Sequence, residues 1–144
     1  MTNESVKPPV WFWVVAAIAL LWNLAGVGAY LGQAFMTDEM REAIPADQLQ
    51  MIDGRPAWAT AAFAIATWGG LLGSILLLAR RGLAYMIFII SLAGVIIQMI
   101  YEVFMIENPV SYGPGEVVMS LLIPIFGIVL ILIAKKGKSA GWLK

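Results

Sequence analysis

The fold class of this chain is decided by residues 11–35, which read WFWVVAAIALLWNLAGVGAYLGQAF. This run holds no charged residue and is long enough to cross roughly 30 Å of hydrocarbon as a helix. A lone strand would leave its backbone polar groups without partners in lipid, so such a run must be helical. Three more apolar runs of sufficient length follow, at 57–79, 83–106 and 116–134. The sequence therefore predicts an all-α integral membrane protein, with residues 1–144 forming a single transmembrane domain built as a four-helix bundle.

The overall composition excludes the soluble functional classes. Of the 144 residues, 61% are hydrophobic and only 12% are charged, whereas an average soluble domain has about 25% charged residues. Mean hydropathy is +0.87 and the formal net charge is zero. These values exclude a soluble enzyme, a nucleic-acid-binding protein and a disordered regulator. The sequence also lacks Cys and His, the residues of disulfides, haem ligation and ordinary zinc sites, so we expect no cofactor, no metal and no enzymatic activity.

Lys and Arg are distributed unequally between the two ends of the predicted helices. In an arrangement with the N-terminus inside, the outer side carries only Arg41 and Arg55. The inner side carries the remaining basic residues: Lys7, Arg80, Arg81, Lys135, Lys136, Lys138 and Lys144. Because positive residues concentrate on the cytoplasmic side, both termini are predicted to face the cytoplasm. The first apolar run is too long for that of a cleaved signal peptide, so we expect it to be retained as a span.

The connection between the first two spans, residues 36–56, is predicted to contain a helical segment over residues 37–53. Thr37 is a suitable N-cap, Pro45 a suitable start for a second short helix, and Gly54 a suitable stop. Apolar residues fall on one side of each short helix, as is typical of helices that lie on a membrane surface. The segment is therefore predicted to form an amphipathic lid on the outer side. A solvated loop that only shields the bundle is the alternative.

Each predicted span has one face of polar or small residues. Lipid is as apolar as Leu, so such residues mark the contacts between membrane helices. Their recurrence at helical spacing in all four spans predicts a bundle with these faces turned inward. The predicted packing positions are Gly26, Gly69, Gly70, Gly73, Ser74 and Gly94.

A mid-membrane pocket is predicted where these faces meet. Trp prefers membrane interfaces, so Trp22 and Trp68 near the middle of their spans are unusual. Pro124, near the middle of the fourth span, frees a carbonyl in the preceding turn and is the candidate hinge. The predicted ligand-binding residues are Trp22, Asn23, Tyr30, Gln33, Trp68, Ser91, Gln98, Tyr101 and Glu102.

These residues also have alternative roles. An Asn in a span often only joins two helices, and glycine pairs are usually packing sites. Glu102 is close enough to the predicted outer border to extend its carboxylate to water, so an interfacial Glu is an alternative to a functional one.

Short motifs are spread over nearly the whole chain: WNLAG at 22–26, PAW at 56–58, GGLLG at 69–73, LLLARR at 76–81 and GWL at 141–143. With these motifs the sequence resembles a group of small four-span bacterial membrane proteins, some of which are labelled sugar transporters. The resemblance implies a multi-pass protein of the bacterial inner, cytoplasmic membrane. The mid-membrane Asn and Trp are also similar to those of SemiSWEET-type sugar facilitators, which differ in having three spans per chain and a proline hinge in the first.

Three functional hypotheses from different classes follow. In the first, the protein binds a neutral or lipid-like small molecule in the polar and aromatic pocket and facilitates its passage, and we expect a homo-oligomer. In the second, it is an accessory or scaffold subunit of a larger membrane complex, and its polar faces serve helix packing. A lipid-modifying enzyme that uses Tyr101 and Glu102 as acid and base is a third hypothesis. The predicted partners are the bilayer, a neutral small molecule, and further membrane subunits; nucleic acid is not expected.

Overall fold

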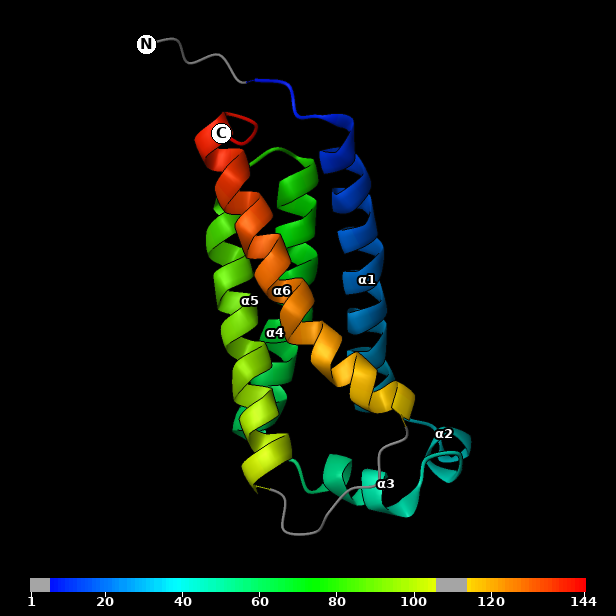
Figure 1. Ribbon diagram of the computed structural model, residues 1–144. Coiled ribbons are helices and arrows are strands. Elements are labelled where there is room, and N and C mark those ends of the chain that lie inside the picture. The colour runs from blue at the N-terminus through cyan, green and yellow to red at the C-terminus, as the bar shows by residue number, and fades with distance from the viewer. Residues whose placement is uncertain (1–5, 106–113) are drawn as a thin grey trace.

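The computed structural model describes residues 6–105 and 114–144, and every regular element in these ranges is a helix. Four long helices dominate the fold (Figure 1): α1 Val10–Ala34, α4 Ala57–Leu78, α5 Leu83–Ile100 and α6 Pro114–Ala140. Each of them is long and apolar enough to cross a membrane. The predicted all-α, multi-pass membrane architecture with four such helices is confirmed.

Two helix ends differ from the predicted spans. α6 continues to Ala140, well beyond residue 134, and carries Lys138 in its last turn. Long basic side chains can extend their charges toward water, and a positive charge near a helix C-terminus is favourable. Lys135, Lys136 and Lys138 therefore do not end the helix. α5 passes directly into a short π-helical segment, η1 Tyr101–Met105. The predicted end of the third span, Ile106, lies outside the described residues.

The long helices pack in chain order (Figure 1): α4 lies between α1 and α5, and α6 packs mainly on α5. The approach of α5 to α4 is the closest, and Gly94 makes it possible. A Cβ on Gly94 would lie 2.7 Å from the carbonyl oxygen of Ala62 and 2.9 Å from the amide nitrogen of Ala66. α6 runs obliquely across the bundle, and it makes few close backbone contacts with α1. The bundle is therefore tight on the α4–α5 side and open between α1 and α6.

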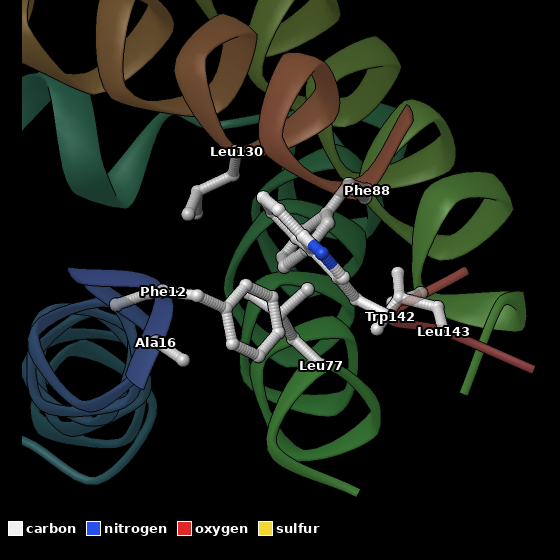
Figure 2. Packing of buried hydrophobic residues seen from close by; sticks show 10 residues of the cluster. Phe12, Ala16, Leu77, Phe88, Leu130, Trp142 and Leu143 are labelled. Atoms are coloured by element: carbon white, nitrogen blue, oxygen red, sulfur yellow. The ribbon is translucent and has the colours of Figure 1, made fainter. Parts of the chain in front are cut away.

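The hydrophobic core lies at one end of the bundle, where the N-terminal segment and the C-terminal segment meet; we call it the terminal end. Figure 2 shows side chains from all four long helices and the C-terminal segment converging there. Trp142 is only 8% exposed, and its ring centroid lies 5.5 Å from that of Trp11 and 5.6 Å from that of Phe12. The core residues are Phe12, Ala16, Ala19, Leu77, Ala84, Phe88, Leu130, Ala134, Trp142 and Leu143.

The C-terminal segment reaches this core because of the turn that ends α6. Gly141 has a φ of +83°, the left-handed conformation that favours glycine. The Trp142 N–H donates to the Gly137 carbonyl at 2.8 Å, which folds the last residues back onto the bundle. The Val6 N–H then donates to the Gly141 carbonyl at 3.0 Å. One turn therefore buries Trp142 and joins the two ends of the described chain.

The turn that ends α4 uses a residue that is unusual at such a position. Arg80 has a φ of +59°, yet its N–H donates to the Leu77 carbonyl at 3.0 Å, as glycine does at this place in a helix-ending turn. The side chain of Arg80 is held by the neighbouring segments. Its Nε donates to the Trp142 carbonyl at 3.0 Å, and its Nη2 donates to the Val6 carbonyl at 2.9 Å. These bonds offset the backbone strain and join three segments of the chain.

The opposite end of the bundle, which we call the loop end, carries the connection between α1 and α4. It contains two short helices, α2 Asp38–Glu42 and α3 Ala46–Asp53. Thr37 caps α2 as predicted, since its side chain accepts from the Met40 N–H at 3.3 Å. Pro45 is predicted to be the first residue of the second short helix. It occupies the N-cap of α3 instead, one position earlier, because its backbone is still extended with a ψ of 143°.

Two contacts hold this connection together. Arg41 makes a bidentate ion pair with Asp53, with nitrogen–oxygen distances of 2.7 Å and 3.1 Å. The hydrogen bond from Arg41 lowers the pKa of Asp53 below its ordinary value. The Tyr101 hydroxyl donates to the Met51 carbonyl at 3.0 Å, which attaches α3 to the end of α5.

Candidate ligand-binding cavity

A cavity of about 420 Å³ lies between the four long helices, beside the core and in the open side of the bundle. Phe88 and Leu130 belong to the core and also line the cavity, so the cavity begins where the core ends. Ligand pockets are typically about 300–1,000 Å³ in volume, so this one suits a small molecule. The lining residues are Trp22, Asn23, Ala25, Gly26 and Ala29 of α1; Phe63, Ala66, Thr67 and Gly70 of α4; Phe88, Ser91, Val95 and Gln98 of α5; and Met119, Ile123, Phe126, Gly127 and Leu130 of α6.

The polar wall of the cavity is organised around Asn23. Its Nδ2 donates to the Ala19 carbonyl at 2.8 Å and to the Ser74 Oγ at 2.9 Å. Ser74 is fully buried, and its hydroxyl donates to the Gly70 carbonyl at 2.8 Å. This chain of hydrogen bonds joins α1 to α4 and fixes the orientation of the Asn23 amide.

The two hydroxyl groups of the wall are held by backbone carbonyls. The Ser91 Oγ donates to the Ala66 carbonyl at 2.7 Å, across the α4–α5 contact. The Thr67 Oγ1 donates to the Phe63 carbonyl at 2.9 Å within α4. Buried polar groups in lipid need such partners, and helix carbonyls one turn earlier or on an adjacent helix supply them.

An aromatic pair joins α1 and α6 beside the cavity. The rings of Trp22 and Phe126 stack with centroids 4.9 Å apart and an interplanar angle of 13°. Both rings line the cavity. Since the backbones of α1 and α6 pack little against each other, this stack joins the two helices through side chains at the cavity.

A second polar group lies toward the loop end of the cavity. Arg55 Nη1 donates to the Gln33 Oε1 at 3.0 Å, and its guanidinium lies 5.0 Å from the ring centroid of Phe63. Gln98 Nε2 donates to the Glu102 Oε1 at 3.4 Å. Phe63 and Gln98 line the cavity, so the charged side chains stand behind its loop-end wall and contact it through these two residues.

The structure brings some of the predicted ligand-binding residues to the cavity and places others elsewhere. Trp22, Asn23, Ser91 and Gln98 line it. The other five predicted ligand-binding residues do not line it: Tyr30, Gln33, Trp68, Tyr101 and Glu102.

The residues outside the lining have other contacts. Trp68 is 45% exposed on the side of α4 away from the cavity and touches Tyr30 edge-on, with ring centroids 6.4 Å apart. The ring of Tyr101 packs edge-on against that of Trp58, with centroids 5.9 Å apart, at the loop end. Pro124, the predicted hinge, lies inside α6 between cavity-lining Ile123 and Phe126 without lining the cavity itself.

The predicted packing glycines lie at close approaches between helices. A Cβ on Gly73 would lie 2.6 Å from the Phe88 ring, and one on Gly69 would lie 3.2 Å from the Ser91 Cβ. Gly26 has more room, since its nearest neighbour would be the Thr67 methyl group at 3.6 Å. A Cβ on Gly70 would overlap the Asn23 side-chain oxygen. Gly26 and Gly70 also line the cavity, so these two positions shape it.

Some residues that matter for the cavity are not among the predicted ligand-binding residues. Thr67 repeats at seven-residue spacing with Ser74, and this spacing was a sufficient signal for a shared face. Phe126 has no such signal, because Phe is an ordinary lipid-facing residue. Arg55 counts only as a loop charge in the sequence, although its guanidinium reaches back to Gln33 and Phe63.

No family model matches the chain, and comparison with curated proteins and with solved structures finds no similar one.

Proposed function

We propose that this protein binds a neutral or lipid-like small molecule in the cavity and facilitates its passage through the membrane. The observation that carries the proposal is the cavity itself, which lies in the middle of four membrane-length helices and combines apolar walls with a few polar atoms. Among the described residues, no Lys, Arg, Asp or Glu lines it. A charged ligand would lose its hydration without gaining a counter-ion there, so a neutral ligand fits this lining best.

The passage of the ligand would involve α6. The half of α6 that precedes Pro124 carries Met119 and Ile123 along the cavity, whereas the half that follows carries Leu130 and Ala134 in the core. Pro124 removes one backbone hydrogen bond between these halves. In the proposed mechanism the half of α6 that precedes Pro124 moves away from α1 and takes Met119 and Ile123 out of the cavity wall, so the cavity opens sideways toward lipid. Phe126 follows Pro124 and keeps its contact with Trp22.

For the setting we propose the inner membrane of a bacterium, with both termini in the cytoplasm. The support is the excess of basic residues at the terminal end together with the family resemblance. Homo-oligomerisation belongs to the same proposal, because four helices around one cavity leave little space for a continuous pore.

A structural role in a larger membrane complex is the second candidate. The hydrogen bond from Asn23 to Ser74 favours it, because that bond joins α1 to α4 without any ligand. In this case the polar wall would serve assembly, and the partner would be another membrane subunit.

A matched pair of glycine variants tests the first proposal. A leucine at Gly26 would grow into the cavity, whereas a leucine at Gly28, two residues along the same helix, would meet open space. The protein is extracted gently from its own membrane and analysed by native mass spectrometry. The wild type and Gly28→Leu are expected to retain a small molecule that Gly26→Leu loses. A wild-type protein that carries no small molecule, or a Gly26→Leu variant that retains it, contradicts the proposal; a second, different membrane protein in the wild-type complex supports the structural role instead.

A further inference from the structure

We propose that the cavity selects ligands that bring a hydrogen-bond donor, such as a hydroxyl or N–H group on an otherwise apolar molecule, over ligands that can only accept. The juxtaposition that carries this inference is the Asn23 Oδ1 beside the Ser91 Oγ, both against Gly70 of α4. It rests on the proposed function, since it names the chemical class of the molecule that the cavity binds.

The Asn23 side chain presents an acceptor because both of its N–H groups are occupied. The atom 2.8 Å from the Ala19 carbonyl must be the amide nitrogen, since a carbonyl can only accept. The second N–H goes to the Ser74 Oγ, whose own hydrogen goes to the Gly70 carbonyl. Within the described residues no donor reaches the Asn23 Oδ1, so this oxygen retains its full capacity to accept.

The hydroxyl groups of Ser91 and Thr67 can also only accept a hydrogen bond from a ligand. Ser91 and Thr67 each give their single hydrogen to a backbone carbonyl, that of Ala66 and that of Phe63. Only the lone pairs of their oxygens remain for a ligand. At this level of the cavity the protein therefore offers acceptors and no donor from these three side chains.

Gly70 brings two of these acceptors together. A Cβ built on Gly70 would overlap the Asn23 Oδ1 and would lie 3.5 Å from the Ser91 Oγ. The two oxygens thus border the same small space, so one hydroxyl or N–H group placed there can reach either of them. Two other lining side chains can donate. Gln98 keeps one N–H, but it lies seven residues from Ser91, about 10 Å along the helix. Trp22 has an indole N–H, but its ring stacks on Phe126 of α6, whereas the two oxygens border Gly70 of α4.

The size of the selectivity follows from the cost of binding a ligand that has no hydrogen-bond donor. An ether or ketone placed against these oxygens would set acceptor against acceptor and leave the Asn23 Oδ1 buried without a donor. A site built around such groups rejects the ligand that cannot pair with them. We expect the donor ligand to bind at least tenfold more tightly than its methyl ether.

Two neutral probes of nearly the same shape test the inference, 2-naphthol as the donor and 2-methoxynaphthalene as the acceptor-only partner. The full chain is reconstituted in lipid nanodiscs, and binding is measured by equilibrium dialysis against protein-free nanodiscs, so that partition into lipid is subtracted. Gly26→Leu and Gly28→Leu show whether the bound probe occupies the cavity. Ser91→Ala removes one acceptor, and Ser120→Ala, exposed on α6 outside the cavity, is its matched control.

The expected result is a preference of tenfold or more for 2-naphthol that shrinks several-fold in Ser91→Ala, persists in Ser120→Ala, and disappears with all binding in Gly26→Leu. Equal binding of the two probes in the cavity, or a preference unchanged by Ser91→Ala, would overturn the inference while leaving the cavity as a binding site. Failure of both probes to bind above the protein-free nanodiscs, or binding unaffected by Gly26→Leu, would count against the proposed function itself.

Discussion

Arg80 offers the sharpest test of how the terminal end is held together. Its side chain joins the Trp142 and Val6 carbonyls, while its backbone holds a left-handed conformation that is unfavourable for any residue other than glycine. Replacement by alanine removes the hydrogen bonds and keeps the strain. Replacement by glycine removes the hydrogen bonds and relieves the strain. The two variants therefore separate the two effects at one position.

The magnitudes follow from these contacts. Hydrogen bonds from a charged donor contribute about 1.5–3 kcal/mol each when buried, and the bond to Val6 is exposed and counts for less, so Arg80→Ala is expected to lower the free energy of unfolding by about 2 kcal/mol. The left-handed backbone costs a non-glycine residue about 1 kcal/mol, so Arg80→Gly is expected to recover about that much relative to Arg80→Ala. Arg81→Ala, at the exposed neighbouring residue, should stay within about 0.5 kcal/mol of the wild type.

Reversible unfolding of the full chain in mixed micelles, titrated with dodecyl sulfate and followed by tryptophan fluorescence, measures these differences. From most to least stable, the expected order is wild type, Arg80→Gly and Arg80→Ala. An Arg80→Ala variant as stable as the wild type would show that the hydrogen bonds from Arg80 to the Trp142 and Val6 carbonyls do not stabilise the bundle. An Arg80→Gly variant less stable than Arg80→Ala would refute the backbone argument.

Three further outcomes are expected. Gly94→Ala should destabilise the chain by about 1–3 kcal/mol, because its Cβ would press against the backbone of α4, whereas Gly28→Ala should be nearly neutral; the same titration measures both. Trp142→Ala should cost about 3–5 kcal/mol through loss of its buried ring, and a variant that unfolds at the wild-type detergent concentration would contradict the core assignment. The Arg41–Asp53 pair lowers the pKa of Asp53 in the folded state, so its contribution is complete above the ordinary carboxyl pKa and is lost as the pH falls through the lowered value. The hydrogen-exchange protection factors of α2 and α3, which are corrected for the intrinsic pH dependence of exchange, should therefore fall at acid pH in the wild type and change less in Asp53→Asn.

Much of the fold was predictable from the sequence, because the bilayer imposes strict requirements on length and hydropathy. The four apolar runs had to become helices, since lipid offers no partner for an unpaired backbone group. Thr37 and Gly54 marked the ends of the loop-end helices through capping chemistry, which acts between neighbouring residues. Such local rules can be read without knowing how the helices pack.

The candidate site was predictable only in part. Asn23, Ser91 and Gln98 were recognisable because polar residues in a span face the bundle interior. Trp22 and Trp68 carried the same signal, near the middle of a span, yet only Trp22 lines the cavity. Helical periodicity orders the faces of one helix but does not say which face turns toward which neighbour.

Tertiary packing determines which face of each helix turns toward which neighbour. Gly94 lets α5 approach α4 so closely that the rotation of both helices is determined, and Trp68 is thereby left on the outer side of α4. α6 packs on α5 and meets α1 through the stack of Trp22 and Phe126, a contact between residues about a hundred positions apart. The sequence by itself determined that the chain is a bundle of four membrane-length helices, because hydropathy and length act locally. Only the tertiary structure decided that the bundle holds a cavity and which side chains line it, because a cavity depends on where distant helices do not touch.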